Sequence, residues 1–401
     1  MHTVGWDWGS QRHAVTVLDE TGATTQRWNL SHTEDGITTT LRRLATYGDP
    51  AQLPVAIETS KGLVVDRLLA AGHPVVAIHP GTFTAMRPRW GSSRAKSDAF
   101  DSFMLADLLR TDAPHLRVLA PTNPATLEIQ ALSRQRSDLI AARVSAVNQL
   151  QALLEAHWPG AARLFSHLDS DISLSFLERF PTPQSAAKLN PVTMTAFLRR
   201  CRYTGGKSGA ELVERLRQAS QPASRIGRHT VTILITTQAE QVRALARGIA
   251  DLELALSKAL DEHPYAFLFR ALPRVGMVNL AQIIGEIGPM LERGLTADQL
   301  AAEVGMAPVT RASGKVHTVG FRHSANRAAR KAMTHFADNS RHANPWAKDL
   351  YQRARDRGKR HPNAVRILGR GWLRVIHACW RNGIPYDPAA HHAKHRTPPA
   401  S

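Results

Sequence analysis

The sequence predicts a mixed α/β domain followed by mostly helical regions, and three observations support this fold class. Residues 2–8 and 12–19 alternate as strands do, around the turn Gly9-Ser10, and residues 23–30 can form a third strand. Helical and short apolar patterns then take turns up to about residue 110, which is typical of a sheet covered by helices. From residue 122 onward the apolar residues recur at helical spacing instead.

The remaining elements of the first domain follow from the same patterns. Two short apolar runs, residues 53–57 and 74–78, predict two further strands. The predicted helices cover residues 33–47, 60–71 and 98–110. We therefore expect residues 1–120 to form one domain, in which helices pack against a mixed sheet of five strands.

The middle of the chain, residues 121–262, predicts paired helices. One heptad seam consists of Arg136, Ile140, Arg143, Val147, Leu150 and Leu154, and a second consists of Val242, Leu245, Ile249, Leu252, Leu256 and Ala259. Two such helices pair either as an antiparallel coiled coil or within an ordinary helical bundle. Between them, residues 203–209 read YTGGKSG, which lacks the spacing of a phosphate-binding ATPase loop, so we reject that function.

The C-terminal part, residues 263–385, is predicted to be mostly helical, with breaks near Pro345 and Gly358. Residues 267–290 predict a turn between two short helices. The turn reads LPRVG and resembles the hairpin of helix-hairpin-helix DNA-binding units, with Arg274 where a glycine is commoner; a plain structural turn is the alternative. We expect residues 386–401 to be a disordered tail.

Positive charge is concentrated near the C-terminus. The chain carries a net charge of +18, and +14 of it falls within residues 311–381, where thirteen arginines and four lysines meet three aspartates. A surface shaped only for solubility would mix the two signs. The segment therefore indicates a nucleic-acid partner. We expect its tryptophans, Trp346, Trp372 and Trp380, to lie in the core.

Composition excludes several classes of protein. Two cysteines are too few for a disulfide framework or a cysteine-only zinc site, and 43% hydrophobic residues exclude wholesale disorder. No stretch approaches the ~20 unbroken apolar residues of a membrane span. The first residues show no secretion signal. We expect a cytoplasmic protein without a membrane partner.

Four carboxylates stand out by their context. Asp7 lies in a predicted strand, Glu58 ends another, and Asp98 and Asp101 begin a helix with both side chains on one face. Together they predict a site for two Mg²⁺ ions that act on phosphodiesters. The alternatives are ordinary helix capping for Asp98 and a surface acid beside a turn for Asp7.

A serine in a basic setting is the candidate nucleophile. Ser313 lies in a predicted loop, residues 303–315, with Arg311 and Lys315 beside it and Arg322 further on. Basic neighbours suit a serine that attacks phosphate, because they offset the charge of the scissile group. A loop serine is otherwise most often a turn residue.

These segments, taken in order, resemble the DEDD-motif insertion-sequence transposases of the IS110 family, which are relatives of the Piv DNA invertase. The N-terminal matches are GWDWGSQRHAVTVLD, AIETS and AKSDAFDSFMLADLL, which contain the four acids. The later matches are RQRSDLIAARVSAVNQLQALLEAHWPG, LERFPTP, LPRVGMVNLAQIIGEIG, GMAPVTRASGK and NRAARKAM. The resemblance covers about residues 3 to 385. Small departures are Ser97, where threonine is common, and Arg274.

The resemblance implies a RuvC-like, ribonuclease-H-like domain carrying Asp7, Glu58, Asp98 and Asp101, a helical coiled-coil region, and a C-terminal transposase domain carrying Ser313. The implied activity is RNA-guided recombination of double-stranded donor and target DNA, bridged by a noncoding RNA from the element. The serine forms a phosphoserine link to DNA, with Mg²⁺ held by the acids of a partner subunit. The basic residues expected at the nucleic acid are Arg311, Lys315, Arg322, Arg327 and Arg330.

Two other functions stay open at this point. The chain could be a metal-dependent, structure-specific DNA nuclease in which Ser313 is structural, or a nucleic-acid-binding protein without catalysis. For the recombinase we expect binding that weakens steeply with salt, since each neutralised phosphate contributes a slope of about −0.9 on duplex DNA. We also expect a homo-oligomer, a dimer or a tetramer.

Overall fold

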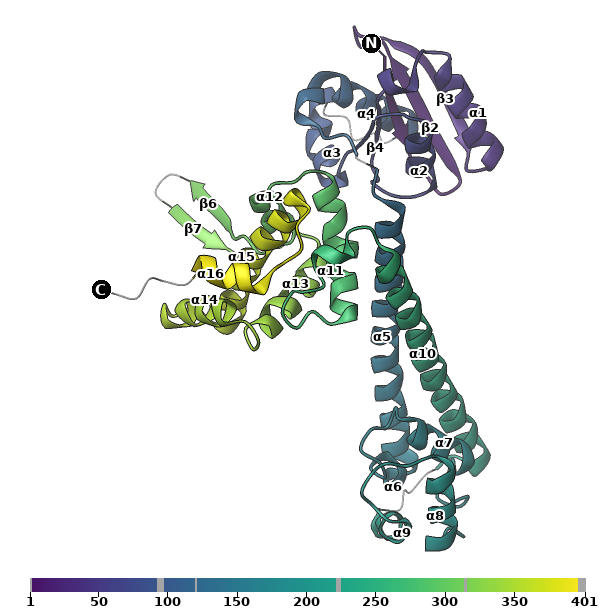
Figure 1. The fold of residues 1–401 in the computed structure, drawn as a ribbon. Helices are drawn as coiled ribbons and strands as arrows, with labels where there is room; N and C mark the ends of the chain where they lie inside the picture. Colours follow the sequence, from purple (N-terminus) through teal and green to yellow (C-terminus); the bar gives the residue numbers. More distant parts are fainter. Residues whose placement is uncertain (1, 92–96, 120, 221–224, 314–315, 396–401) are drawn as a thin grey trace, which may run out of the picture. The chain divides into compact units, whose positions relative to one another are not determined.

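The computed structural model describes residues 2–91, 97–119, 121–220, 225–313 and 316–395 (Figure 1). The chain divides into two compact units, Met1–Thr122 and Asn123–Ser401. The expected boundary at residue 120 lies close to this division, whereas the expected boundary at 262 falls inside the second unit. Among the described residues, no helix combines the length and the apolar character needed to cross a membrane.

The first unit contains a five-stranded sheet in the order β3-β2-β1-β4-β5. Its strands are β1 Thr3–Asp7, β2 Arg12–Leu18, β3 Thr24–Ser31, β4 Val55–Ile57 and β5 Val75–Ala77. Strand β2 runs antiparallel to both β1 and β3, and β4 pairs in parallel with both β1 and β5. All five predicted strands are therefore confirmed.

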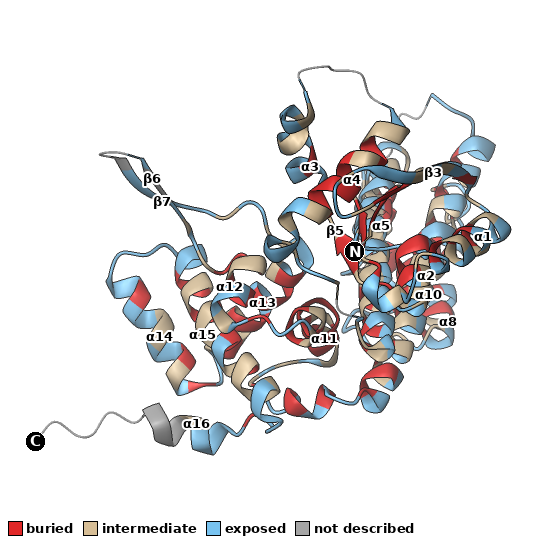
Figure 2. Ribbon diagram, turned by 90° about the horizontal axis from the view of Figure 1, so that it is seen from above, coloured by how far each residue is buried: buried red, intermediate tan, exposed pale blue. Residues whose placement is uncertain are grey.

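Helices cover this sheet, and one of them approaches it very closely. The helices are α1 Glu34–Ala45, α2 Leu63–Ala70, α3 Pro80–Met86 and α4 Asp98–Asp112, of which only α3 was not predicted. Helix α4 packs on β1 at Gly5, where an added Cβ would lie 1.9 Å from the carbonyl oxygen of Ser102. Glycine is required here because no side chain fits between the two backbones. Figure 2 shows how much of α4 is buried.

Two long helices pair in the second unit. They are α5 Pro124–His157 and α10 Arg228–Glu262. The contacts run from Thr126–His263 at one end, through Arg136–Glu253, to Gln149–Gln238, so the helices are antiparallel. Arg136, an unusual residue for a seam, is neutralised by Glu253 with 2.5 Å between nitrogen and oxygen.

Four shorter helices lie between the C-terminal end of α5 and the N-terminal end of α10 in the chain and share a core with these two helices. They are α6 Pro159–Ala162, α7 Asp171–Arg179, α8 Pro191–Arg200 and α9 Gly209–Gln218. Phe176 and Phe197 are fully buried in this core. The glycine-rich segment, residues 203–209, leads into α9. Its Ser208 caps that helix and forms a capping box with Glu211.

The C-terminal body is helical, as predicted. Its helices are α11 Met277–Glu292, α12 Ala297–Glu303, α13 Arg327–Ser340, α14 Pro345–Asp356, α15 His361–Asn382 and α16 Pro388–His395. The expected breaks are confirmed, since Pro345 begins α14 and Gly358 separates α14 from α15 with φ +75°. Trp372 is fully buried at its centre, and its indole N–H donates to Ser340 Oγ at 2.8 Å.

Two expectations for this body need correction. The tail prediction is wrong up to residue 395, because Tyr386 is only 4% exposed and accepts a hydrogen bond from Asn344, after which α16 follows. Residues 396–401 lie outside the described residues. The expected loop around Ser313 is also wrong in part: β6 Val309–Ser313 and β7 Val316–Gly320 form an antiparallel hairpin. Flanking Gly and Pro obscured the alternation of these short strands.

Candidate active site

Asp7 and Glu58 lie at neighbouring strand ends in the first unit. Asp7 is the last residue of β1, and Glu58 directly follows β4. The two strands are parallel, and Trp6 pairs with Ile57, so the two acids follow at the same edge of the sheet. Both side chains are partly exposed, whereas the apolar residues before them are fully buried. The strand pairing thus brings together two acids that are 51 positions apart in the sequence.

Asp98 and Asp101 lie in the first turn of α4 but in different surroundings. Ser97 caps the helix by accepting a hydrogen bond from Phe100 N at 3.2 Å, so the alternative of Asp98 as the cap is wrong. Asp98 is exposed, while Asp101 is only 2% exposed. Arg87 donates a hydrogen bond to Asp101 Oδ1 and thereby balances its charge.

The four acids suit a divalent cation by chemistry, and only in part by placement. Carboxylate oxygens are the ligands that Mg²⁺ prefers. Within the part of the chain that the structure describes, however, no group of three or more His, Cys, Asp or Glu side chains gathers as a metal site would require. Residues 92–96, directly before Asp98, lie outside the described residues. Convergence of all four acids therefore stays a prediction.

Ser313 lies at the far end of the hairpin. It is the last residue of β6, it pairs with Val316 at the start of β7, and its side chain is exposed. In Figure 1 the hairpin projects from the helical body of the second unit, and Figure 2 shows most of its described residues as exposed. Lys315 and the side chain of Arg311 lie outside what the structure describes. The serine hydroxyl is thus presented to solvent on a narrow extension of the fold.

The other predicted basic residues lie at the opposite end of the hairpin. Val309 pairs with Gly320 at its base, and Arg322 follows there. Ser313 lies four residue steps along β6 from Val309, a distance of roughly 14 Å at the usual rise per residue of a strand. The structure therefore separates Arg322, one of the basic residues expected to act on the scissile phosphate, from Ser313.

These arginines form a crowded cluster at the hairpin base. The Arg330 guanidinium lies 4.5 Å from the Phe321 ring centroid and donates a hydrogen bond to the Arg322 carbonyl. Arg366 lies 4.9 Å from the same ring. Burial lowers the pKa of Arg330, and the nearby charge of Arg327 lowers that pKa further. Close cations that are partly removed from water favour an anionic partner.

Arg366 belongs to this cluster and was not singled out by the sequence. Burial and the charge of Arg330 lower its pKa as well. Together with Lys359 it lines a cavity of about 500 Å³ beside Phe321. Its position within the basic segment was the available signal, but only the folding of α15 against the hairpin base distinguishes it from the segment's other arginines.

The acids within the basic segment are already engaged. Asp338 binds Arg341, and Asp349 binds Arg353, each at 2.7 Å. Asp356 accepts a hydrogen bond from Gln352. The segment therefore keeps its large excess of positive charge for another partner.

The tryptophans of the segment serve the core, as predicted. Trp372 is fully buried, and Trp346 packs edge-on against it with the ring centroids 5.0 Å apart. Trp380 packs against Tyr265 at 4.6 Å. These rings are committed to packing, so the basic face rather than aromatic stacking carries the expected nucleic-acid contacts.

Comparison with known proteins finds family models that match two parts of the chain. Residues 4–159 match the transposase family model for DEDD transposases of the IS110 type, and residues 266–352 match that of the IS116/IS110/IS902 transposase family. One relative, from Streptomyces coelicolor, is named as a candidate transposase of the IS117 mini-circle. It is 31% identical over 398 residues, covering 96% of this chain and 94% of the relative.

Two further relatives come from other insertion elements. An uncharacterised 42 kDa protein of IS900 from Mycobacterium paratuberculosis is 25% identical over 390 residues, covering 96% of this chain and 97% of the relative. An uncharacterised 43.6 kDa protein of IS110 from Streptomyces coelicolor is 28% identical over 297 residues, covering 73% of this chain and 72% of the relative. The protein is thus a transposase, an enzyme that acts on DNA strands. The chain belongs to the IS110 family of DEDD transposases.

Proposed function

We propose that this transposase is an RNA-guided DNA recombinase that cuts, exchanges and rejoins strands to move its insertion sequence. The observation that carries the proposal is the division of the chemistry between two units. In the first unit Asp7 and Glu58 lie at neighbouring strand ends and Asp98 and Asp101 in the first turn of α4, whereas the exposed residue Ser313 lies on a hairpin of the second unit. Such a division suits an active site assembled from separate parts, including parts of different subunits.

The N-terminal unit is proposed to be a RuvC-like, ribonuclease-H-like domain. The strand order β3-β2-β1-β4-β5, with three antiparallel strands and then two parallel ones, supports this assignment. So does the placement of Asp7 and Glu58 at adjacent strand ends. The antiparallel helices α5 and α10 are proposed as the helical coiled-coil region, because their seams at heptad spacing pair them with each other.

Ser313 would carry the covalent step. Its hydroxyl oxygen attacks the scissile phosphorus, an Oγ–P ester bond forms, and the bond from phosphorus to the deoxyribose oxygen breaks. The proton lost by the serine ends on that oxygen, which becomes a free hydroxyl. A hydroxyl of the partner strand reverses the step, so rejoining needs no ATP. Mg²⁺ held by Asp7, Glu58, Asp98 and Asp101 would activate the hydroxyl and polarise the phosphate.

Donor and target DNA, the guide RNA and a second copy of the chain are the proposed partners. The +14 segment and the arginine cluster at the hairpin base support nucleic-acid binding, with Arg322, Arg327 and Arg330 among the contacts and Arg311 and Lys315 near the serine. The RNA is carried over from the family resemblance alone. Sequencing the RNA that copurifies with the protein tests it directly, and RNA of unrelated sequences would contradict it.

Trapping the covalent intermediate tests the reaction. Wild-type protein is incubated with Mg²⁺ and a suicide DNA substrate, denatured, and examined for protein attached to a DNA end. We expect an adduct with wild type and with Thr318→Ala, an exposed hairpin control, and none with Ser313→Ala or Asp7→Ala. An adduct that persists in Ser313→Ala overturns the nucleophile. Cleavage without any adduct would favour the metal-dependent nuclease.

A further inference from the structure

The cavity of about 500 Å³ at the base of the hairpin is built from three segments of the second unit. They are residues 305–308, the end of β7 with the two residues that follow it, and the start of α15 with the turn before it. Its polar lining consists of Arg322, Lys359, Asn363 and Arg366, and no acid among the described residues lines it. Its apolar lining includes Met306, Val319, Phe321 and Ile367.

Arg366 is oriented by the protein and is also open to a ligand. Its guanidinium lies 4.9 Å from the ring centroid of Phe321, and its Nη2 donates a hydrogen bond to Asn363 Oδ1. No other described residue accepts a hydrogen bond from it. The residue is partly exposed, and its remaining nitrogen atoms are not buried, in contrast to the Nε atoms of Arg322 and Arg330. A ligand in the cavity can therefore reach N–H groups of Arg366 that have no partner in the protein.

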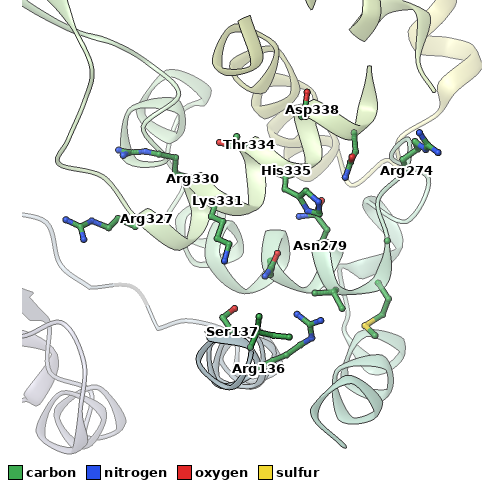
Figure 3. Close-up of a pocket in the computed structure, with 16 residues that line it drawn as sticks. Arg136, Ser137, Arg274, Asn279, Arg327, Arg330, Lys331, Thr334, His335 and Asp338 are labelled. Carbon is green, nitrogen blue, oxygen red and sulfur yellow. The ribbon is translucent and has the colours of Figure 1, made fainter. Parts of the chain in front are cut away.

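A second arginine holds the ring of Phe321 from α13. The Arg330 guanidinium lies 4.5 Å from the same ring centroid and donates to the Arg322 carbonyl at 2.6 Å. Gly305, at φ +75°, leaves room for this guanidinium at the place where a Cβ would project. In Figure 3 Arg330 leaves α13 in a different direction from Lys331, which extends toward α5. The backbone of one segment and a side chain of another thus fix the position of the ring.

The hairpin-base cluster, defined as Arg322, Arg330, Lys359 and Arg366, keeps its positive charge. Among the described residues, no acid forms an ion pair with any of these four side chains. The acids of the nearby helix α12 are engaged elsewhere, because Glu303 binds Arg293 at 2.7 Å and Asp298 binds Arg370 at 2.8 Å. Four cations without a counterion repel one another, and a bound anion relieves that repulsion.

A phosphodiester group matches the chemistry and the position of this cavity. A guanidinium binds two oxygens of a phosphate with its planar fork, and the apolar lining suits the adjoining deoxyribose. Ser313 lies along the same hairpin, roughly 14 Å from its base at the usual rise of a strand. One strand of a duplex rises about 3.4 Å per nucleotide, so this length spans no more than about four nucleotides.

We propose that the hairpin-base cluster grips one phosphate of the DNA strand that reaches Ser313, no more than about four nucleotides from the scissile phosphate. Arg366 binds the phosphate oxygens, Lys359 and Arg322 offset the charge, and Phe321 holds the Arg366 guanidinium in place. Such a contact sets the register of the strand on the hairpin without reading its sequence. The inference rests on the proposed function in taking the DNA that is linked to Ser313 as the partner.

The test removes the charge of one phosphate at a time. A duplex that carries one end of the element is prepared in a series, each member with a single uncharged methylphosphonate at a different linkage. Affinities of the full-length protein are measured without Mg²⁺, and the linkage that forms the covalent adduct is identified separately. We expect one methylphosphonate, no more than about four nucleotides from that linkage, to weaken binding about tenfold, the effect of one lost charge-assisted contact.

Variants of Arg366 connect this linkage to the cluster. Arg366→Ala should weaken binding of the unmodified duplex about tenfold and should abolish the effect of the sensitive methylphosphonate. Arg366→Lys keeps the charge without the planar fork and should recover only part of the affinity, so full recovery contradicts the two-oxygen contact. The matched control is Arg200→Ala, an exposed arginine 5.7 Å from the ring of Phe197, which should keep the methylphosphonate effect.

The outcomes separate this site from the recombinase itself. If no linkage near the adduct position is sensitive, or if the effect is equal in wild type and Arg366→Ala, the site is overturned while the adduct leaves the recombinase intact. A sensitive linkage that depends on Arg366, without any adduct, supports the phosphate contact and contradicts the recombinase. Weaker binding of copurified RNA in Arg366→Ala, with unchanged DNA binding, also overturns the site.

Discussion

The edge of the sheet and the tip of the hairpin present their functional groups in opposite ways. Asp7 ends a strand whose preceding residues are fully buried, and α4 lies so close that only glycine fits at position 5. Ser313 is the last residue of β6, at the tip of a two-stranded hairpin whose described side chains are mostly exposed. One group is fixed by a core on both sides of its strand, while the other depends on a short ladder of main-chain hydrogen bonds.

This difference suits the division of roles in the proposed function. Acids that hold a metal ion need positions that do not shift, because small displacements weaken catalysis. A serine that must reach a strand, become linked to it and be released gains from an exposed extension with few packing constraints. The comparison predicts that substitutions near the acids change stability strongly, whereas matched substitutions on the hairpin do not.

The largest effect on stability is expected for Gly5→Ala. The added Cβ would lie 1.9 Å from Ser102 O and 2.5 Å from Ala106 N, so α4 must move away from β1. We expect a loss of about 3 kcal/mol in the free energy of unfolding of the first unit, measured by denaturant titration. Gly320→Ala on the hairpin, where nothing lies within 4 Å of an added Cβ, should change the free energy of unfolding of its own unit little. Equal effects of the two would remove the contrast.

Glu286→Ala should loosen the body that supports the hairpin. The substitution leaves Arg134 without its bidentate partner and removes a hydrogen bond from Asn326. Breaking such a buried pair costs about 3 kcal/mol. Glu303→Ala, which removes a half-exposed pair with Arg293, should cost less than about 1 kcal/mol. Thermal unfolding of the two variants checks the order, and a larger shift for Glu303→Ala would contradict it.

Acid should destabilise the first unit through His13. Burial, and then the charge of His32, lower the pKa of His13 to about 4. As pH falls below about 6.5 the unfolded chain takes up this proton first, so stability present above that pH is lost down to about pH 4. The slope is at most about 1.4 kcal/mol per pH unit. His13→Gln should flatten the difference between unfolding at pH 7 and pH 5, and an unchanged slope would refute the assignment.

Arg274→Gly should have the smallest effect, and in the stabilising direction. A non-glycine residue at φ +56° carries strain that glycine relieves. We expect a gain of up to about 1 kcal/mol in the free energy of unfolding, with weaker nucleic-acid binding because a cation beside α11 is lost. Calorimetry and a salt titration measure the two effects. A destabilised variant would show that the Arg274 side chain matters to the fold.

Several of these features could be predicted from the sequence because their causes are local. The alternation in residues 2–8 and 12–19 predicts two of the strands, and the heptad spacing around Leu150 and Leu256 predicts the paired helices. Arg274 is an unusual residue for its turn, and its positive φ explains why glycine is commoner at such a position. Short hairpins and tails are harder, since the strand around Ser313 and the buried Tyr386 depend on distant partners.

The sequence by itself determined the family, the helical and strand periodicities, the excess of positive charge and the identity of the four acids and the serine. Only the tertiary structure decided which of these residues meet. Parallel pairing of β1 with β4 placed Asp7 beside Glu58, and the folding of α15 against the hairpin base brought Arg366 to the same aromatic ring as Arg330. The physical reason is that periodicity and charge act along the chain, whereas strand register and helix packing depend on contacts between residues far apart in it.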